Sequence, residues 1–345
     1  MRPEIVVGLS GGVDSFVTAL LLQQKGFWVV GVHLNLWTKE ASAGLSQLCA
    51  HLNIPLLQYD GTELFRQKVV DTFISEYLSG RTPNPCTLCN NTVKWALLRR
   101  AATEAGIEKM ATGHYVRVKD FEGGPSLYKG VDPVKDQSYF LWGLSREILF
   151  AACTPLGDYT KKEVKAMAER CGYPSLAKKK ESMGICFLEG RDYREFILLQ
   201  LPQLAEKTGN IVDLSGKIIG RHKGLLNYTI GQKRDMPLKK GLPLYVARID
   251  ILSNTIVAAE KNELFTHTLW LEHLCFQRES DLYEEHIEIK VRGLGLNPEG
   301  YIRIQRESAD LLKISLASPA WAVAPGQPAA LYCGERLIGG GIISR

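Results

Sequence analysis

Three segments of the sequence carry residues that could do chemistry, and the first is a glycine-rich string. The residues GLSGGVDS, Gly8–Ser15, lie between the apolar run Ile5-Val6-Val7 and a helix-like apolar run. Glycines that open a helix expose backbone N–H groups to an anion, and the helix dipole adds positive potential there. A tight strand-to-helix turn uses the same residue types, so the glycines alone leave both interpretations open. The string as a whole favours a phosphate site.

The full string also narrows the kind of phosphate site. It lacks the lysine of the nucleoside triphosphatase loop and the third glycine of the dinucleotide-binding loop. The pattern S-G-G-x-D-S instead resembles the pyrophosphatase loop of enzymes that split ATP between its α and β phosphates and leave AMP on an oxygen. Such enzymes activate a carbonyl or amide oxygen so that a nucleophile can replace it. We expect Ser10 and Ser15 to donate to phosphate oxygens and Asp14 to help hold Mg²⁺.

The other two segments carry thiols. Cys86 and Cys89 lie in the turn-rich stretch GRTPNPCTLCNNTVKW, and Cys186 lies in ESMGICF. A thiol at a helix N-terminus beside basic residues has a lowered pKa, so we expect a helix to begin at Cys89 and its thiol to be reactive. A buried cysteine that only caps the helix is the alternative, and zinc would need a second C-x-x-C or paired histidines. The polar stretch before Cys186 predicts an accessible thiol, which suggests sulfur delivery.

Further polar groups follow at three places. His114 in ATGHYVRV follows a strand-like run, and we expect it to contact substrate rather than to catalyse. The triplet Lys135-Asp136-Gln137 precedes an aromatic run and could bind a nucleotide or cap a helix. The basic segment 221–241 suits an RNA backbone, although a solvated charged loop is the plainer interpretation.

The elements that must position these residues alternate between strand and helix in the first half of the chain. We expect strands at 4–8, 27–34, 54–59 and 108–112, and helices at 14–25, 42–52, 62–78 and 89–105. This alternation predicts an α/β domain with a parallel sheet, whose ligands lie at the carboxyl ends of the strands. The site is therefore predicted at the loops 8–15, 34–40, 80–89 and 112–115.

The pattern changes after residue 200. Short strand-like runs separated by Gly and Pro turn signals predict an antiparallel β-barrel. We therefore expect a catalytic domain at 1–204, a small linking domain at 205–265 and a C-terminal β-barrel at 266–345.

Composition excludes several classes of protein. The chain has 345 residues, of which 45% are hydrophobic and 23% charged, so disorder is disfavoured. The eight cysteines are scattered, which argues against a disulfide framework. No apolar run is long enough to span a bilayer and no leader precedes the first strand, so we expect no membrane association and a cytoplasmic location. The net charge of +5 suits a polyanionic partner.

These motifs in this order resemble the tRNA-specific 2-thiouridylase family, the tRNA-uridine 2-sulfurtransferases of the PP-loop ATP pyrophosphatase superfamily. The likeness covers nearly the whole chain and is carried by SGGVDS, GRTPNPxxxCN, TGHY, KDQSYFL, GICF, YTIGQ and APGQPAALYCGERLIGGGI. It implies a PP-loop domain, a central tRNA-contacting domain and a barrel that grips the anticodon arm.

The resemblance also implies roles for individual residues. ATP binding is implied for Gly8, Leu9, Ser10, Gly11, Gly12, Val13, Asp14, Ser15, Leu34 and Gly113. Contact with tRNA is implied for Asn84, Pro85, Cys86, His114, Lys135, Asp136, Gln137, Arg292, Gly293 and Gln327. Cys186 matches the persulfide carrier, and Cys89 matches the catalytic partner that can close a disulfide with it.

The implied reaction begins when ATP with Mg²⁺ adenylates O2 of wobble uridine 34. The terminal sulfur of a Cys186 persulfide then attacks C2, and Cys89 resolves the persulfide or releases hydrosulfide. The implied partners are tRNAs with Lys, Glu and Gln type anticodons and a persulfide or sulfur-relay donor such as a cysteine desulfurase.

One departure from the family pattern concerns Cys86, which stands where many members have an aspartate. A thiol cannot do the acid–base work of a carboxylate at the same pKa. Cys86, Cys89 and Cys186 could instead ligate three irons of a [4Fe–4S] cluster, with the fourth iron left to bind hydrosulfide.

Two other functions stay open from the sequence. Another enzyme of the same loop class, such as an argininosuccinate or guanylate synthase, would need no cysteines. A non-catalytic RNA-binding or sulfur-carrier protein with a decayed nucleotide loop would not form AMP.

Overall fold

A parallel sheet forms the amino-terminal part of the protein, as the alternating pattern predicted. The structure is a computed structural model that describes residues 2–37, 43–179, 184–204, 207–239, 241–293 and 295–344. The sheet has five strands in the order β3-β2-β1-β4-β7, and all of its pairs are parallel. Its strands are β1 Glu4–Gly8, β2 Trp28–Asn35, β3 Leu56–Asp60, β4 Lys109–Ala111 and β7 Ala152–Cys153.

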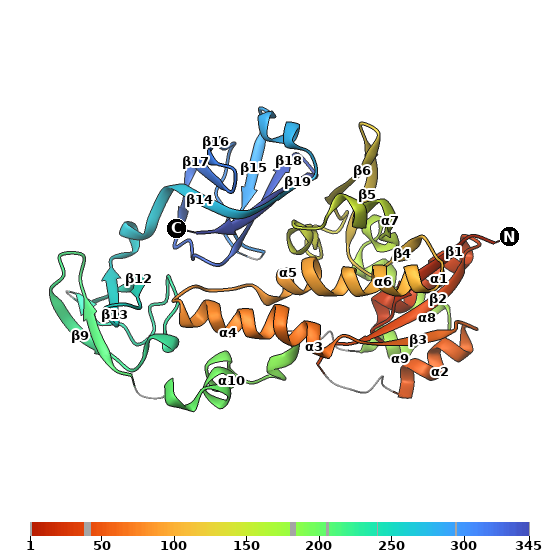
Figure 1. Ribbon diagram of the computed structural model, residues 1–345, viewed down its shortest axis with the longest axis horizontal. Coiled ribbons are helices and arrows are strands. Elements are labelled where there is room, and N and C mark those ends of the chain that lie inside the picture. Colours follow the sequence, from red (N-terminus) through yellow and green to blue (C-terminus); the bar gives the residue numbers. More distant parts are fainter. Residues whose placement is uncertain are drawn as a thin grey trace.

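Helices cover both faces of this sheet (Figure 1). Successive side chains of β1 point to opposite faces of the sheet. Ile5 and Val7 therefore pack with Leu22 of α1 (Val13–Gln24) on one face, and Val6 packs with Leu98 of α6 (Trp95–Glu104) on the other. The described part of the chain has no helix that is both long and apolar enough to cross a bilayer.

Apart from two long helices that are described next, the helices are α1 Val13–Gln24, α2 Ala43–His51, α7 Arg146–Ala151, α8 Lys161–Arg170, α9 Pro174–Lys178 and α10 Tyr193–Gln200.

Two long helices run side by side and extend away from the parallel sheet (Figure 1). Residues 62–78 form a helix as expected, and it consists of α3 Thr62–Phe65, the π-helical turn η1 Arg66–Val70 and α4 Asp71–Leu78. The second consists of α5 Pro85–Cys89, the π-helical turn η2 Asn90–Lys94 and α6 Trp95–Glu104. Short 3₁₀ helices occur at Ser138–Leu141, Pro155–Asp158, Cys186–Leu188, Pro202–Leu204, Leu225–Asn227, Lys261–Leu264 and Glu279–Tyr283.

The expected start of the second long helix at Cys89 is wrong. The helix begins at Pro85, because the side chain of Asn84 accepts a hydrogen bond from the backbone N–H of Thr87 and proline suits the first helical position. Cys89 therefore lies a full turn inside the helix rather than at its N-terminus.

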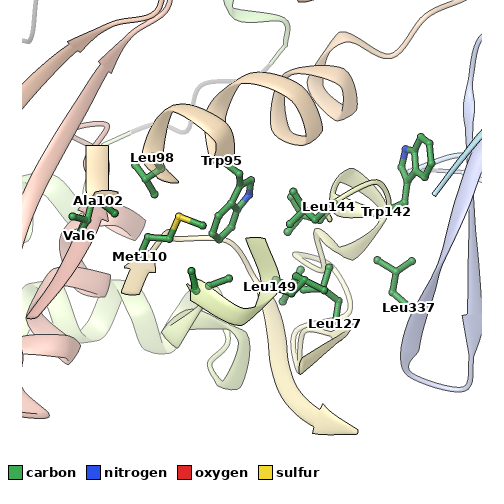
Figure 2. Close-up of a cluster of buried hydrophobic side chains, with 14 of the residues drawn as sticks. Val6, Trp95, Leu98, Ala102, Met110, Leu127, Trp142, Leu144, Leu149 and Leu337 are labelled. Carbon is green, nitrogen blue, oxygen red and sulfur yellow. The ribbon is translucent and has the colours of Figure 1, made fainter. Parts of the chain in front are cut away.

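The packing of this helix on the sheet forms the largest buried cluster (Figure 2). Trp95 and Leu98 lie against Met110 of β4, and all three side chains are fully buried. The cluster continues through Trp142 to Leu337 of the C-terminal sheet, so the two halves of the molecule share one core.

The C-terminal sheet is antiparallel, which confirms the expected fold class. Its main path runs β15-β18-β19-β14-β17-β16. These strands are β14 Phe265–Phe276, β15 Ile287–Lys290, β16 Arg303–Ser308, β17 Leu311–Trp321, β18 Pro328–Cys333 and β19 Arg336–Ile343. Along the chain, a four-stranded sheet in which β8 and β13 pair in parallel comes between the two large sheets, and a two-stranded ribbon accompanies it. In space it lies at the end of the molecule opposite the parallel sheet (Figure 1). Their strands are β8 Gly209–Val212, β9 Ile218–His222, β12 Tyr245–Asp250, β13 Thr255–Ala259, β10 Leu238–Lys239 and β11 Leu242–Pro243.

A hairpin that the sequence did not predict joins the first domain to the C-terminal sheet. Its strands, β5 Val116–Phe121 and β6 Gly124–Lys129, extend that sheet because β6 pairs with β19. The ring of Phe121 contacts the guanidinium groups of Arg278 and Arg336 at 4.3 and 4.0 Å. Asp281, whose side chain is 2% exposed, accepts hydrogen bonds from both arginines at 3.0 and 2.8 Å.

Replacement of Asp281 by alanine should destabilise the protein strongly, because it leaves two half-buried or buried guanidinium groups without their shared carboxylate. We expect a loss of about 3–5 kcal/mol in the free energy of unfolding, measured by urea titration. The matched control is Glu279→Ala, which removes an exposed partner of Arg306 and should cost no more than about 1 kcal/mol. Equal effects of the two substitutions would contradict this assignment.

Candidate functional site

A cavity of about 320 Å³ lies at the carboxyl ends of the first, second and fourth strands. Its size is in the range of small-molecule sites. Its wall consists of Gly8, Leu9, Ser10, Asp14, Ser15, Val32, His33, Leu34, Leu36, Lys94, Leu98, Thr112, Gly113, His114 and Gln137. The loops predicted at 8–15, 34–40 and 112–115 thus meet here, although residues 38–42 lie outside the described residues. The loop 80–89 does not line this cavity, and Lys94 of the following helix does.

The glycine-rich loop holds itself open with its own hydrogen bonds. Ser15 Oγ accepts from the backbone N–H of Ser10 at 3.2 Å and donates to the carbonyl oxygen of Gly12 at 3.1 Å. Gly11 has a φ of 72°, a conformation that suits glycine. Gly11, Gly12 and Val13 shape the turn into α1 but are not among the residues that line the cavity.

Gly113 is needed for a close approach of two backbones. A Cβ atom there would lie 2.9 Å from the carbonyl carbon of Asp14 and 3.0 Å from the backbone nitrogen of Ser15. Glycine at this position lets the loop after β4 lie against the start of α1 at the cavity wall.

Asp14 is engaged by two residues that were not predicted from the sequence. Lys161 Nζ donates to both carboxylate oxygens at 2.8 Å, and the Tyr115 hydroxyl donates to Oδ1 at 2.8 Å. The capping box of Thr160 and Glu163 marks the start of α8, so the helix could have been located. No spacing links Lys161 to Asp14, which is 147 positions away.

His114 is buried in the cavity wall as a neutral imidazole. Its Nδ1 lies 2.7 Å from Thr112 Oγ1, and its ring stacks on Trp95 at 5.9 Å between centroids. Burial, aided by the positive charge of Lys94, lowers the pKa of His114 to about 3. His114 therefore brings a polar edge to the site without a charge.

The charge of Lys94 acts on all three thiols proposed for chemistry, and Cys86 and Cys186 also affect the pKa of Cys89. Cys86 and Cys186 are exposed, whereas Cys89 packs in the core with Phe73. Within the described part of the chain, no three His, Cys, Asp or Glu side chains are arranged to hold a single metal ion.

The expectation of a lowered pKa at Cys89 is wrong. Burial raises the pKa of Cys89 to about 11, because the residue lies inside the helix and not at its N-terminus. Cys86 and Cys186 are exposed residues, but the protein atoms around their sulfurs exclude enough water to raise the pKa of both thiols. The charge of Lys94 opposes this rise at all three sulfurs.

Several residues implied to contact tRNA hold the protein together. Asn84 caps α5 and Pro85 is its first residue. Asp136 accepts hydrogen bonds from Ser138 and, across the domains, from Lys290 Nζ at 3.3 Å. Gln137 Oε1 accepts from the backbone N–H of Tyr115 at 3.0 Å and also faces the cavity. The half-buried Lys135 precedes this pair.

The residues implied in the barrel lie at its contact with the first domain. Arg292 donates to the carbonyl oxygens of Trp321 and Ala322 at 2.5 and 2.6 Å. A Cβ at Gly293 would lie 3.1 Å from the ring of Tyr139. Gln327 Nε2 donates to the carbonyl oxygen of Thr82 at 2.6 Å. A second cavity, of about 420 Å³, opens at this contact and is lined by residues that include Arg81, Asn84, Trp142 and His273.

The three parts of the chain match three family models. Residues 3–190 match the tRNA methyl transferase HUP domain, residues 197–260 the tRNA methyl transferase PRC-barrel domain, and residues 266–343 the aminomethyltransferase beta-barrel domain.

The whole chain is also similar to curated proteins. It is 39% identical over 345 residues to the tRNA-specific 2-thiouridylase MnmA 2 of Phocaeicola vulgatus, with 99% of this chain and 97% of that protein covered. It is 38% identical over 361 residues to MnmA 1 of Caldanaerobacter subterraneus, with 99% and 98% covered. It is 39% identical over 345 residues to MnmA of Syntrophomonas wolfei, with 99% of each covered.

Replacement of Gly113 by alanine should disrupt nucleotide binding, since the added methyl group would push the backbone of Asp14 away. We expect the Kd for ATP, measured by calorimetry, to rise on the order of 100-fold. Gly44→Ala is the matched control, because a Cβ there meets nothing within 4 Å. Unchanged ATP binding by the Gly113 variant would contradict the proposed close approach.

Proposed function

The chain belongs to the tRNA-specific 2-thiouridylase family, and on that premise we propose that it uses ATP to replace O2 of wobble uridine 34 in tRNA with sulfur. One observation carries the proposal. Lys94 lines the cavity beside the Gly8–Ser15 loop, and its charge also acts on Cys86, Cys89 and Cys186. Sulfur transfer to an adenylated carbonyl requires an ATP-splitting loop and thiol groups at one site. Methyl transfer, which the names of two family models mention, would need neither.

The first step is adenylation of the uridine. O2 attacks the α-phosphorus of ATP, the bond to the β-phosphate breaks, and pyrophosphate leaves. The backbone N–H groups of the Gly8–Ser15 loop bind the phosphates. The residues present do not fit a Mg²⁺ ion held by Asp14, because both carboxylate oxygens accept from Lys161. No step depends on such an ion, and Mg²⁺ enters with the phosphates of ATP.

The second step is sulfur transfer. The terminal sulfur of a Cys186 persulfide attacks C2, the C2–O2 bond breaks, and AMP leaves with the electron pair. The Cys89 thiolate then attacks the Cys186 sulfur, which releases 2-thiouridine and leaves a Cys89–Cys186 disulfide. An external thiol reduces that disulfide before the next turnover. Cys89 must lose its proton for this step, and burial opposes that loss.

A [4Fe–4S] cluster on Cys86, Cys89 and Cys186 is a second route to the same product. The observation in its favour is the set of possible ligands. Cys86 is a thiol where many family members have an aspartate, and the pKa of Cys89 is affected by both Cys86 and Cys186. Cluster thiolates each bind a different iron, so they need no single-ion arrangement. When bound, such a cluster would supply an iron with an open coordination position for a sulfur ligand.

The partners follow from the same proposal. We assign tRNAs with Lys, Glu and Gln type anticodons as substrates, with contacts at Asn84, Pro85, Cys86, His114, Lys135, Asp136, Gln137, Arg292, Gly293 and Gln327. The basic segment 221–241 adds charge toward the RNA backbone, with Lys240 outside the described residues. A persulfide donor such as a cysteine desulfurase supplies the sulfur, and the reaction takes place in the cytoplasm.

Cysteine variants test the function. The protein with ATP, a persulfide donor and a tRNA transcript should form 2-thiouridine, measured by mass spectrometry of nucleosides. Cys89→Ser and Cys186→Ser should each lower the rate by at least about 10³-fold, because each removes a sulfur that forms or breaks a bond. Cys171→Ser replaces an exposed cysteine outside the site and should behave like wild type. Full activity of both site variants would instead support a ligase of the same loop class.

Metal analysis separates the two sulfur routes. If the cluster operates, protein purified without oxygen should contain about four iron and four sulfide per chain, and Cys86→Ala should lose both together with activity. If the persulfide relay operates, iron-free protein should be active, and Cys86→Asp should keep activity because neither Cys89 nor Cys186 is changed.

A further inference from the structure

Lys94 occupies an unusual position in its helix. It ends the π-helical turn Asn90–Lys94, in which backbone hydrogen bonds span five residues instead of four. The backbone N–H of Lys94, together with the charge of its side chain, lowers the pKa of the Cys89 thiol five positions earlier, against the larger opposing effect of burial. π-helical turns inside α-helices occur frequently at functional sites. This π-helical turn joins Cys89, which precedes it, to Lys94, which lines the nucleotide cavity.

The ammonium group of Lys94 is held in place by a neutral partner. Its Nζ donates to Oδ1 of the buried Asn90 at 2.9 Å. Among the residues that the structure describes, Lys94 forms no ion pair, whereas Lys161 is paired with Asp14. The charge of Lys94 is therefore available to an anion that enters the cavity.

The groups on which Lys94 acts come from three segments of the chain. Its charge acts on Cys86 and Cys89 of its own helix, on Cys186, and on His114 in the loop after β4. Lys94 thus lines the nucleotide cavity, and its charge also acts on the three thiols. His114 cannot share this role because it is neutral.

We propose that Lys94 is a catalytic residue, whose ammonium binds the α-phosphate of the adenylated uridine and the sulfur anion that attacks it. This inference rests on the proposed function. The attack brings an anionic sulfur toward a carbon that carries an anionic phosphate, and their repulsion raises the barrier. As the C–S bond forms and the C–O bond breaks, the electron pair moves to AMP. One fixed cation between the two anions stabilises this charge without gaining or losing a proton.

The test compares Lys94→Met, which keeps the length of the side chain, with Lys94→Arg, which keeps its charge. At saturating ATP and tRNA, Lys94→Met should form 2-thiouridine about 10²-fold more slowly than wild type. Its KM for ATP and for tRNA should change less than about threefold, because the lost interaction matters most in the transition state. Lys94→Arg should recover activity to within about tenfold of wild type. The matched control, Arg100→Met, removes an exposed cation from the same helix and should leave the rate unchanged.

Each possible result of this test either supports or overturns the role of Lys94, and failure of the proposed function gives a different result. A Lys94→Met enzyme within about threefold of the wild-type rate, or one whose loss lies only in KM, would overturn the proposal. If the methionine variant does not fold, as judged by its thermal melting curve, Lys94→Gln replaces it in the comparison. Equal activity of the Gln and Arg variants would then overturn the proposal, and an active Arg variant beside an inactive Gln variant would support it. Failure of wild type to form 2-thiouridine would overturn the proposed function instead.

Discussion

The structure depends above all on how the helix from Pro85 to Glu104 packs on the parallel sheet. Trp95 and Leu98 bury themselves against Met110, and this contact fixes the rotation of the whole helix. Lys94, which precedes Trp95, is thereby turned into the nucleotide cavity. Cys89, one π-turn earlier, is carried to the same side. A hydrophobic contact thus positions groups that are polar and reactive.

The barrel extends this constraint to the other end of the helix. Arg81 forms ion pairs with Glu76 and with Glu272 of the barrel, both at 2.7 Å. Gln327 binds the backbone of Thr82 in the same loop. The loop that leads into Pro85 is therefore held between the two domains.

Two opposing effects set the chemistry of the thiols. Burial disfavours the thiolate, most strongly at Cys89, while the charge of Lys94 favours it. At Asp14 the interaction is different, since Lys161 forms an ion pair with the carboxylate at 2.8 Å. Lys161 is thus engaged by a carboxylate, whereas Lys94 donates to the neutral amide of Asn90.

The sequence by itself determined the parallel α/β domain, the C-terminal antiparallel sheet and the cavity at the loops near Gly8 and Gly113. These follow from local periodicity and from glycine geometry, and both properties belong to short stretches of chain. It did not determine the helix start at Pro85, the ion pair of Asp14 with Lys161, or the placement of Lys94. Only the tertiary structure decided these, because hydrogen-bonded caps, burial and charge pairing arise between segments whose separation along the chain carries no signal.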